Sequence, residues 1–269
     1  MKKSLYILTL FVSAITLSGC SGTTKEASEQ TEVITPTPSV IKEEVTQMPS
    51  PAPISAFTEG VLIKKRPNNN ACFTFETADG FQILSDPYEV NELLQPDVIL
   101  ESHQHGDHND TSEVEGDYTL ITEPGEYTFD KAEIRGFSGV HNKGDVDGTN
   151  YIFVTKMEDI TIAHFASQAA VPSEEVLEQI GKVDILLIQV FVNPNYNKLL
   201  PTDLPVIVDK LQPKIIIPEH GQSDADVIIA KKLSITSEAE PSGEIIITRS
   251  MLDQMTETKV INLDTTVTR

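Results

Sequence analysis

Several residue types are scarce in this sequence of 269 residues, and each scarcity excludes something. Trp is absent and only Cys20 and Cys72 are cysteines, so the chain is not a disulfide-rich scaffold. Lys and Arg together number 20 against 41 Asp and Glu, which gives a net charge of -21. This charge repels polyanions, and no basic patch with interleaved aromatic residues is present, so nucleic-acid binding is disfavoured.

The apolar run near the N-terminus, from Leu5 to Leu17, is short for a transmembrane helix, which needs about 20 residues. It follows Met1-Lys-Lys-Ser and ends at Leu17-Ser-Gly-Cys20, and this start resembles the signal of a bacterial lipoprotein. The resemblance implies that residues 1–19 are removed and that Cys20 carries diacylglycerol, whose two chains give stable anchoring. We therefore expect an extracytoplasmic lipoprotein that is anchored to the membrane. An N-terminal transmembrane helix is the alternative.

The segment after Cys20 is rich in Thr, Ser, Pro and Glu and has no aromatic residue up to position 56. Such a segment cannot bury enough apolar surface to fold. We therefore expect residues 20–56 to be a disordered tether and residues 57–269 to be one folded domain. Cys72 lies in an apolar segment of that domain, where a buried thiol is the expected state.

The folded domain shows strand patterns first and alternating strand and helix patterns later. Runs of β-branched and aromatic residues predict strands, and an apolar face after a capping residue predicts a helix. The expected strands are Gly60–Lys64, Ala71–Glu76, Phe81–Leu84, Val98–Ser102, Thr119–Thr122, Ile134–Phe137, Asn150–Thr155, Ile160–His164, Ile185–Gln189 and Ile215–Pro218. The expected helices begin after Ser173 and near Leu204 and Asp224. This order predicts an α/β fold in which two sheets form a sandwich with helices outside.

The run Glu101-Ser-His-Gln-His-Gly-Asp-His108 is the most specific pattern in the chain, and it follows an apolar stretch that predicts a strand. Alternate residues of an extended backbone point the same way, so His103 and His105 can hold one metal ion. Asp107 and His108 can then turn towards a second ion. Imidazole nitrogen together with carboxylate oxygen suits zinc first, and iron or manganese next. A solvated polar loop is the alternative.

This run resembles the metal motif of the metallo-β-lactamase superfamily, and its surroundings look like the ascorbate-phosphate-lactonase-like branch of metal-dependent hydrolases. The resemblance extends along most of the folded domain and uses all six histidines of the chain. The further matching segments are Ile83–Pro87, His141 with Asn150–Val154, Ile160–His164, Val183–Ile188 and Pro213–His220. The fold that the resemblance implies is the αβ/βα sandwich of that superfamily.

The resemblance also implies two sets of metal ligands. One set is His103, His105 and His141, and the other is Asp107, His108 and His220. The implied cofactor is zinc, as one or two ions, with manganese or iron as alternatives. Asp86 and His164 are implied to orient ligands from behind. For Asp86 the alternative is a plain turn-forming Asp-Pro pair.

The sequence departs from the family pattern at two places. Relatives read His-Leu-Gly-Asp after the strand at Ile160, and that Asp bridges two metals, whereas this chain reads His164-Phe-Ala-Ser167. Removing a negative charge from between two dications raises their mutual repulsion, so this departure weakens the second site. Gln189–Tyr196 also replaces a Gly-rich turn, so substrate contacts do not transfer through it.

These observations predict a lipid-anchored, metal-dependent hydrolase. Metal-activated water would attack a lactone, ester, amide or phosphoester of a small-molecule substrate, and Asp107 would position that water or accept its proton. The membrane would be reached through the lipid on Cys20. The alternative, which Ser167 motivates, is a catalytically degenerate lipoprotein that binds a metal or a ligand on the same fold.

Overall fold

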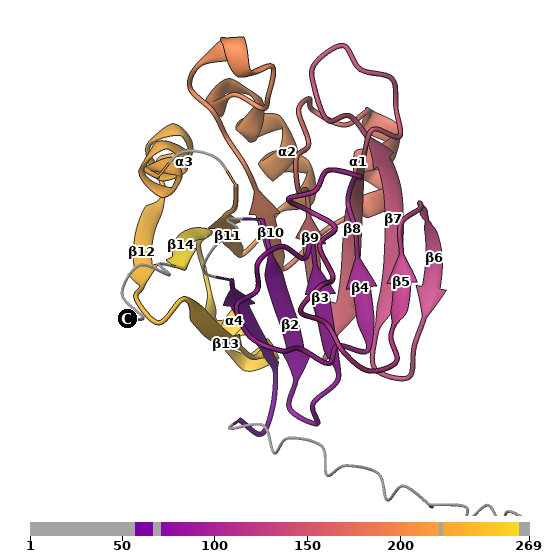
Figure 1. The fold of residues 1–269 in the computed structure, drawn as a ribbon. Coiled ribbons are helices and arrows are strands. Elements are labelled where there is room, and N and C mark those ends of the chain that lie inside the picture. Colours follow the sequence, from indigo (N-terminus) through magenta and orange to yellow (C-terminus); the bar gives the residue numbers. More distant parts are fainter. Residues whose placement is uncertain (1–56, 67–70, 221–222, 264–269) are drawn as a thin grey trace, which may run out of the picture. The chain divides into compact units, whose positions relative to one another are not determined.

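Two β-sheets pack face to face in the part of the chain that this computed structural model describes, residues 57–66, 71–220 and 223–263 (Figure 1). The predictions for residues 1–56, namely the signal peptide, the lipid on Cys20 and the tether, lie outside the described residues. Within the described residues, no helix combines the length and the apolar character that crossing a membrane requires.

The first sheet has six strands in the order β13-β1-β2-β3-β4-β5. Its strands are β1 (Val61–Lys65), β2 (Phe73–Thr77), β3 (Gln82–Ser85), β4 (Val98–Leu100), β5 (Thr119–Ile121) and β13 (Glu244–Ile247). The pairs from β13 to β3 are antiparallel, and β3, β4 and β5 are parallel. Strands β3 and β4 therefore end at the same edge of the sheet, and the loop with the histidine motif leaves β4 there.

The second sheet has eight strands in the order β12-β14-β11-β10-β9-β8-β7-β6. Its strands are β6 (Gly125–Thr128), β7 (Glu133–Gly139), β8 (Asn150–Met157), β9 (Ile160–His164), β10 (Ile185–Ile188), β11 (Ile215–Pro218), β12 (Thr236–Glu240) and β14 (Lys259–Leu263). Strands β6 to β9 are antiparallel neighbours, whereas β9, β10, β11, β14 and β12 are parallel. Parallel strands are buried on both faces, and accordingly all four residues of β10 and of β11 are buried.

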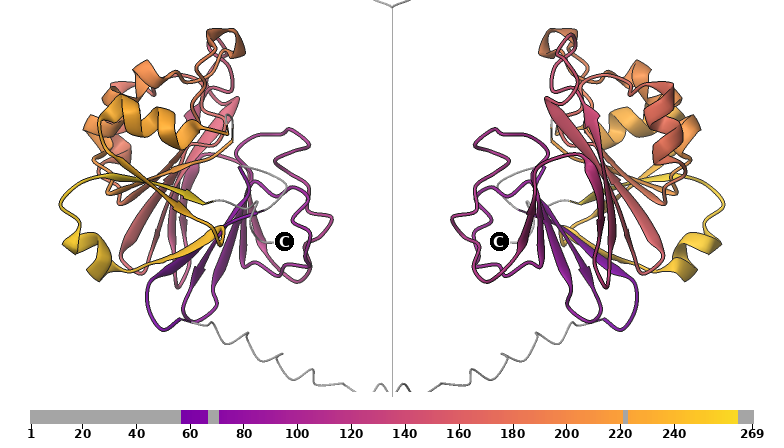
Figure 2. Two further views of the ribbon diagram at one scale, coloured as in Figure 1. Left: turned by 90° about the vertical axis from the view of Figure 1, so that its left-hand side faces the viewer. Right: turned by 90° about the vertical axis from the view of Figure 1, so that its right-hand side faces the viewer.

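Helices cover the outer face of the eight-stranded sheet (Figure 2). They are α1 (Glu174–Ile180), α2 (Leu204–Leu211) and α3 (Ala225–Leu233). The expected N-cap is present, because Ser173 accepts a hydrogen bond from the backbone N–H of Val176. Leu177, Ile207 and Ile229 from the three helices are buried in one cluster against the sheet.

In the described part of the chain, loops and not helices cover the outer face of the six-stranded sheet. Val90 and Leu94 from the connection between β3 and β4 pack with Leu84 and Ile99 of the strands. Cys72 is buried in the same cluster, as predicted, and burial raises the pKa of its thiol to about 12. The α/β sandwich of two sheets is confirmed, with α1, α2 and α3 on one side.

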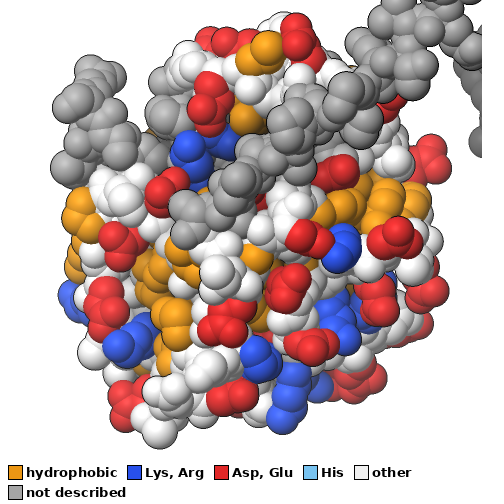
Figure 3. Space-filling view, turned by 90° about the horizontal axis from the view of Figure 1, so that it is seen from below, with side chains coloured by type: hydrophobic (Ala, Val, Ile, Leu, Met, Phe, Trp, Pro, Cys, Tyr) orange, Lys and Arg blue, Asp and Glu red, His pale blue; other side chains and the backbone are white. Residues whose placement is uncertain are grey.

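The sequence patterns did not predict the short strand β6 or the elements of the C-terminal part. Strand β13 pairs with β1, β14 enters the parallel part of the second sheet, and α4 (Arg249–Gln254) connects them. At the lower end of the molecule, acidic and basic side chains are interspersed on the surface between apolar patches (Figure 3).

Candidate metal centre

The residues of the predicted metal site follow four strands from the two sheets. The motif Glu101–His108 follows β4, His141 follows β7 by two residues, His164 ends β9 and His220 follows β11. The structure brings together the two sets of ligands that the family resemblance implied. His103, His105 and His141 form the first ligand group, and Asp107, His108 and His220 form the second; in each group the three candidate ligand atoms lie within 4.8 Å of one another.

The two ligand groups are neighbours. The ring centroids of His103 and His108, one from each group, are 4.0 Å apart. Burial differs across the site: His103 and His108 are buried, whereas His105 and Asp107 are exposed. An ion in either group would therefore be held from the protein side and remain open towards solvent, which is the arrangement of a catalytic rather than a structural metal site.

His103 has the environment of a metal ligand. Its Nδ1 lies 2.9 Å from the Ser102 hydroxyl, and that hydroxyl donates to Oδ2 of Asp86 over 2.7 Å. Because the Ser102 hydroxyl donates its proton to Asp86, the hydroxyl oxygen can only accept from Nδ1–H of His103. The proton of this imidazole is then on Nδ1, and the lone pair of Nε2 is free. This Nε2 is buried and has no hydrogen-bond partner among the described residues. An orphaned acceptor of this kind fits a metal ion.

Asp86 lies behind both ligand groups. Besides its contact with Ser102, its Oδ2 lies 3.0 Å from Nδ1 of His108, and Nε2 of His108 faces Asp107 at 3.8 Å. A carboxylate behind a ligating imidazole orients the ring and raises its basicity. Complete burial would raise the pKa of Asp86, but His108 outweighs it and holds that pKa at about 2. Burial would lower the pKa of His108, but Asp86 raises it above its usual value.

His141 is positioned by contacts on both sides of its ring. Its backbone N–H donates to Thr149 over 3.0 Å, and its Nδ1 lies 3.0 Å from the Asn142 amide. Its Nε2 lies 3.0 Å from Nζ of Lys198, which also donates to the carbonyl of His141. Burial and the nearby Lys198 charge lower the pKa of His141 to about 4, and burial lowers the pKa of Lys198 to about 8.

His164 lies in a fully buried polar chain and belongs to neither ligand group. Its Nδ1 is 2.7 Å from the Ser85 hydroxyl, and its Nε2 is 2.6 Å from Glu219 and 4.0 Å from Asp86. Burial would lower the pKa of His164, but the Glu219 carboxylate raises it; burial raises the pKa of Glu219 in turn. Asp86 thus lies between His164 and His108 of the second ligand group. This is the supporting position that the family resemblance implied for His164.

Asn150 supports the His141 loop through a glutamine that the sequence analysis missed. The Asn150 amide donates to the carbonyl of Phe165 over 3.2 Å and to Oε1 of Gln168 over 3.3 Å. The same Oε1 accepts from the backbone N–H of Val140, which precedes His141. Gln168 is buried, and no local pattern announces it, because its partners come from β8 and from the end of β7.

Ser167, the departure from the family pattern, is buried three residues after the end of β9. The two ligand groups consist of His and Asp residues alone. A hydroxyl carries no charge, so the turn after β9 contributes no carboxylate to the centre. Glu219 and Lys198 are the charged residues at the site that sequence reasoning missed. The signal for Glu219 was a carboxylate directly after the apolar strand Ile215–Pro218, whereas Lys198 had none.

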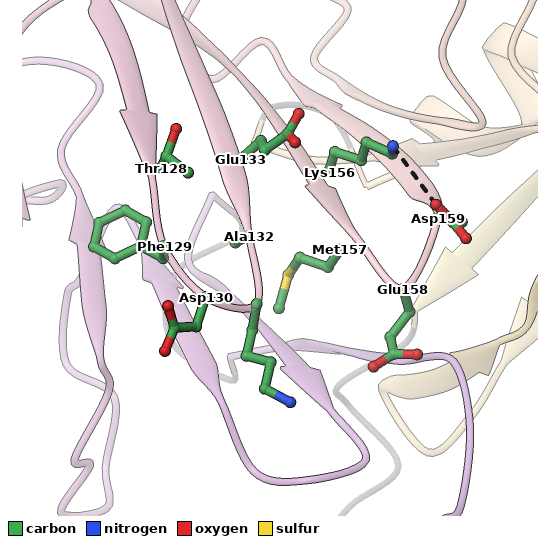
Figure 4. Close-up of a pocket in the computed structure, with 10 residues that line it drawn as sticks. Thr128, Phe129, Asp130, Ala132, Glu133, Lys156, Met157, Glu158 and Asp159 are labelled. Atoms are coloured by element: carbon green, nitrogen blue, oxygen red, sulfur yellow. Dashed lines mark ion pairs between the residues drawn. The ribbon is translucent and has the colours of Figure 1, made fainter.

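A cavity of about 370 Å³ lies beside the first ligand group. Its lining includes all three histidines of that group together with Thr122, Asp145 and Tyr151. A smaller hollow of about 200 Å³ lies between the turns that join β6 to β7 and β8 to β9 (Figure 4). These turns are at the opposite end of β7 from His141, and the charged Lys156 and Asp159 there form an ion pair at 3.5 Å. The cavity that the three histidines line is therefore the one that gives a small molecule access to the candidate centre.

The chain resembles a known protein family in its sequence and several solved structures in its fold. Residues 68–220, more than half of the sequence, match the family model described as the beta-lactamase superfamily domain. No functionally curated protein matches. Among solved structures, a proposed Zn-dependent hydrolase of the metallo-β-lactamase superfamily from Thermotoga maritima is 25% identical, with a TM-score of 0.58 over 75% of this chain and 97% of that chain.

Two further structures share the fold at low identity. A proposed metal-dependent hydrolase from Parabacteroides distasonis is 12% identical, with a TM-score of 0.55 over 76% of this chain and 93% of that chain. CmlA, a diiron β-hydroxylase from Streptomyces venezuelae, is also 12% identical, with a TM-score of 0.51 over 76% and 53% of the two chains. One fold thus accompanies different metals, so it does not identify the ion here. With its two ligand groups at the strand ends and its family match over residues 68–220, this chain belongs to the β-lactamase superfamily.

Proposed function

We propose that this protein is a metal-dependent hydrolase that acts on a small molecule with a lactone, ester, amide or phosphoester bond. The observation that carries the proposal is the buried Nε2 of His103, which has no hydrogen-bond partner among the described residues. His103 also belongs to a group of three histidines whose candidate ligand atoms lie within 4.8 Å of one another. Three imidazoles around an open position form a ligand set of catalytic zinc. Zinc is therefore the proposed ion, in one or both ligand groups.

Bound zinc would supply a water molecule of lowered pKa for attack on the substrate. The chain's own residues prepare this chemistry. Burial lowers the pKa of His103 to about 2, so its imidazole is neutral at neutral pH, which is the form that binds metal. Asp107 is exposed at the open side of the second ligand group, where its carboxylate can hold the attacking water or accept its proton.

We further propose that the protein acts outside the cytoplasm, tethered to a membrane through lipid on Cys20. The support is the Leu17-Ser-Gly-Cys20 sequence after a short apolar run. Radiolabelled fatty acid supplied to expressing cells should enter the wild-type chain and not the Cys20→Ala variant. Equal labelling of the two would remove the anchor from the proposal.

Metal content of the purified full chain tests the hydrolase. After exposure to zinc, manganese or iron and removal of loose ions, we expect one or two ions per wild-type chain. His103→Ala should lose at least one of them, because it removes a buried ligand of the first group. Gln104→Ala is the matched control, since this exposed neighbour belongs to neither group. A wild type that retains no ion would overturn the proposal.

The second candidate is a binding protein that has lost turnover, and Ser167 favours it. Wild type and Ser167→Asp, both loaded with zinc, should be compared on chromogenic lactones, esters, amides and phosphoesters. Hydrolysis by the wild type supports the enzyme. An inactive wild type that Ser167→Asp activates would establish the degenerate alternative.

A further inference from the structure

Lys198 is built into the edge of the first ligand group. The residue before it, Asn197, has left-handed backbone geometry (φ 55°), and its carbonyl accepts from the N–H of Lys143 over 2.9 Å. The residue after it, Leu199, is fully buried, and its carbonyl accepts from the N–H of Phe191. The backbone is thus held on both sides of Lys198, so its half-buried side chain starts from a fixed place beside His141.

Among the described residues, the contacts of the Lys198 ammonium group are with neutral acceptors. It lies 3.0 Å from Nε2 of His141 and donates to the carbonyl of the same residue. Among the described residues, no carboxylate lies within ion-pair distance of it. Lys143, on the loop after His141, differs because its ammonium is 3.1 Å from Asp203. A half-buried cation without an anionic partner is unfavourable unless a ligand supplies the charge.

Metal binding would leave this cation in need of a partner. The Nε2 atom of His141 has a single lone pair, which the ammonium of Lys198 uses in the structure. A metal ion that the first ligand group held through this atom would need the same lone pair, and its charge would repel the ammonium. Lys198 must then leave Nε2, while its anchored backbone keeps the ammonium next to the centre.

We infer that Lys198 binds an anionic oxygen group, a carboxylate or a phosphate, of the substrate beside the first ligand group. The inference rests on the proposed function and deepens it, because it restricts the substrates to molecules that carry such a group near the bond to be hydrolysed. The ammonium of a lysine whose backbone is held in place is a common partner for carboxylate and phosphate groups. The ammonium and a bound dication would together supply local positive charge, so that a strongly acidic protein could accept an acidic small molecule.

The test is calorimetric titration of the zinc-loaded full chain with inorganic phosphate and, separately, with acetate. Lys198→Met keeps the length of the side chain and removes its charge, and should weaken binding of at least one anion by about tenfold. Lys198→Arg should retain most of the affinity. Lys143→Met is the matched control, because it removes a nearby lysine that Asp203 already neutralises, and should bind both anions like the wild type.

Zinc content is measured for every variant, so that the two proposals fail separately. Lys198→Met should hold as much zinc as the wild type, since it removes only a competitor for Nε2 of His141. Unchanged affinity of the loaded variant for both anions would overturn the inference and leave the hydrolase standing. If the wild type held no zinc, the hydrolase would fall. The anion titrations would then be repeated with the metal-free chain. Loss of anion binding in Lys198→Met, with binding retained in the wild type and in Lys143→Met, would support the inference, and any other result would overturn it.

Discussion

Asp86 is the residue on which both ligand groups depend. Its Oδ2 accepts the Ser102 hydroxyl that fixes His103, and the same oxygen lies 3.0 Å from His108. The residue has a positive φ of 48°, a conformation that costs a side-chain-bearing residue about 1–3 kcal/mol. It persists because the Asp86 N–H donates to Leu100 and its carboxylate also accepts from the Ser102 N–H.

Asp86→Asn should therefore weaken zinc binding in both groups. The amide keeps the size of the side chain but loses the charge that supports His108 and the acceptor that holds the Ser102 hydroxyl. Removal of such a partner typically lowers metal affinity by about 10–100-fold. Competition with a chromogenic chelator measures it. Asp97→Asn, which alters a carboxylate that accepts from the N–H of Gln82, is the control. Wild-type affinity in Asp86→Asn would contradict this role.

At the scale of residues, the histidine motif could be recognised because its members are close in sequence. His103, His105, Asp107 and His108 follow one strand, and a strand followed by such a run has few other uses. Lys198, Glu219 and Gln168 could not be predicted as part of the site, because their partners are supplied by other strands and loops. A lone polar residue shows no period and no spacing until the fold brings its partner to it.

Among the secondary-structure elements, the end of β7 is the tightest point near the centre. A Cβ atom on Gly139 would lie 2.2 Å from Oε1 of Gln168, whose amide is held by Val140, Asn150 and the carbonyl of Ala170. Strand β7 can therefore approach the turn after β9 only because its last residue lacks a side chain.

Gly139→Ala should destabilise the protein and disturb the first ligand group. The new methyl group would displace the Gln168 amide and leave the N–H of Val140 without its partner, at a cost of about 1–3 kcal/mol. Thermal melting of the variant in the absence of zinc would show a lower Tm. Zinc titration would show a lower affinity of the first ligand group for zinc. Gly106→Ala is the control for added volume, because its Cβ would meet no atom within 4 Å. Equal melting of the two variants would refute the packing argument.

Strand prediction worked where strands carry apolar residues and failed where pairing alone creates them. Strands β9 and β11 match the expected ranges, because each is rich in β-branched residues and is almost fully buried. Strand β12, Thr-Ser-Glu-Ala-Glu, is almost fully exposed and has no apolar pattern. It forms because β14 lies beside it in parallel register, and Lys259 of β14 pairs with Glu238 at 2.7 Å. Such an element depends on its neighbour more than on its own residues.

For the whole molecule, the histidines make stability depend on pH in two opposite ways. In the metal-free protein, burial holds the pKa of His103 at about 2 and that of His141 at about 4, against about 6.5 in an unfolded chain. Below about pH 6.5 the unfolded chain binds protons that the folded one refuses, so stability falls on acidification. His108 and His164 have raised pKa values, so their contribution is present below about pH 6.5 and is lost as pH rises through those values.

The metal-free protein should accordingly be most stable near pH 6.5 and melt at lower temperature on either side. Thermal melts between pH 4 and pH 9 after chelation would show this. Saturating zinc should raise the Tm most at and above neutral pH, because protons compete with zinc for the imidazoles. A Tm of the chelated protein that does not change across this range would contradict the burial of neutral His103.

The pairing of β1 with β13 has a consequence for how the chain folds. Val61 lies opposite Ile247, so the first strand of the described domain meets its outer neighbour only near the end of the sequence. Contacts of such high sequence separation form slowly, because a long loop must close before they contribute. Until residue 247 is available, β1 is an uncovered edge that can pair with another chain. Strand β13 therefore protects β1 from such pairing, although it contributes no ligand to either group.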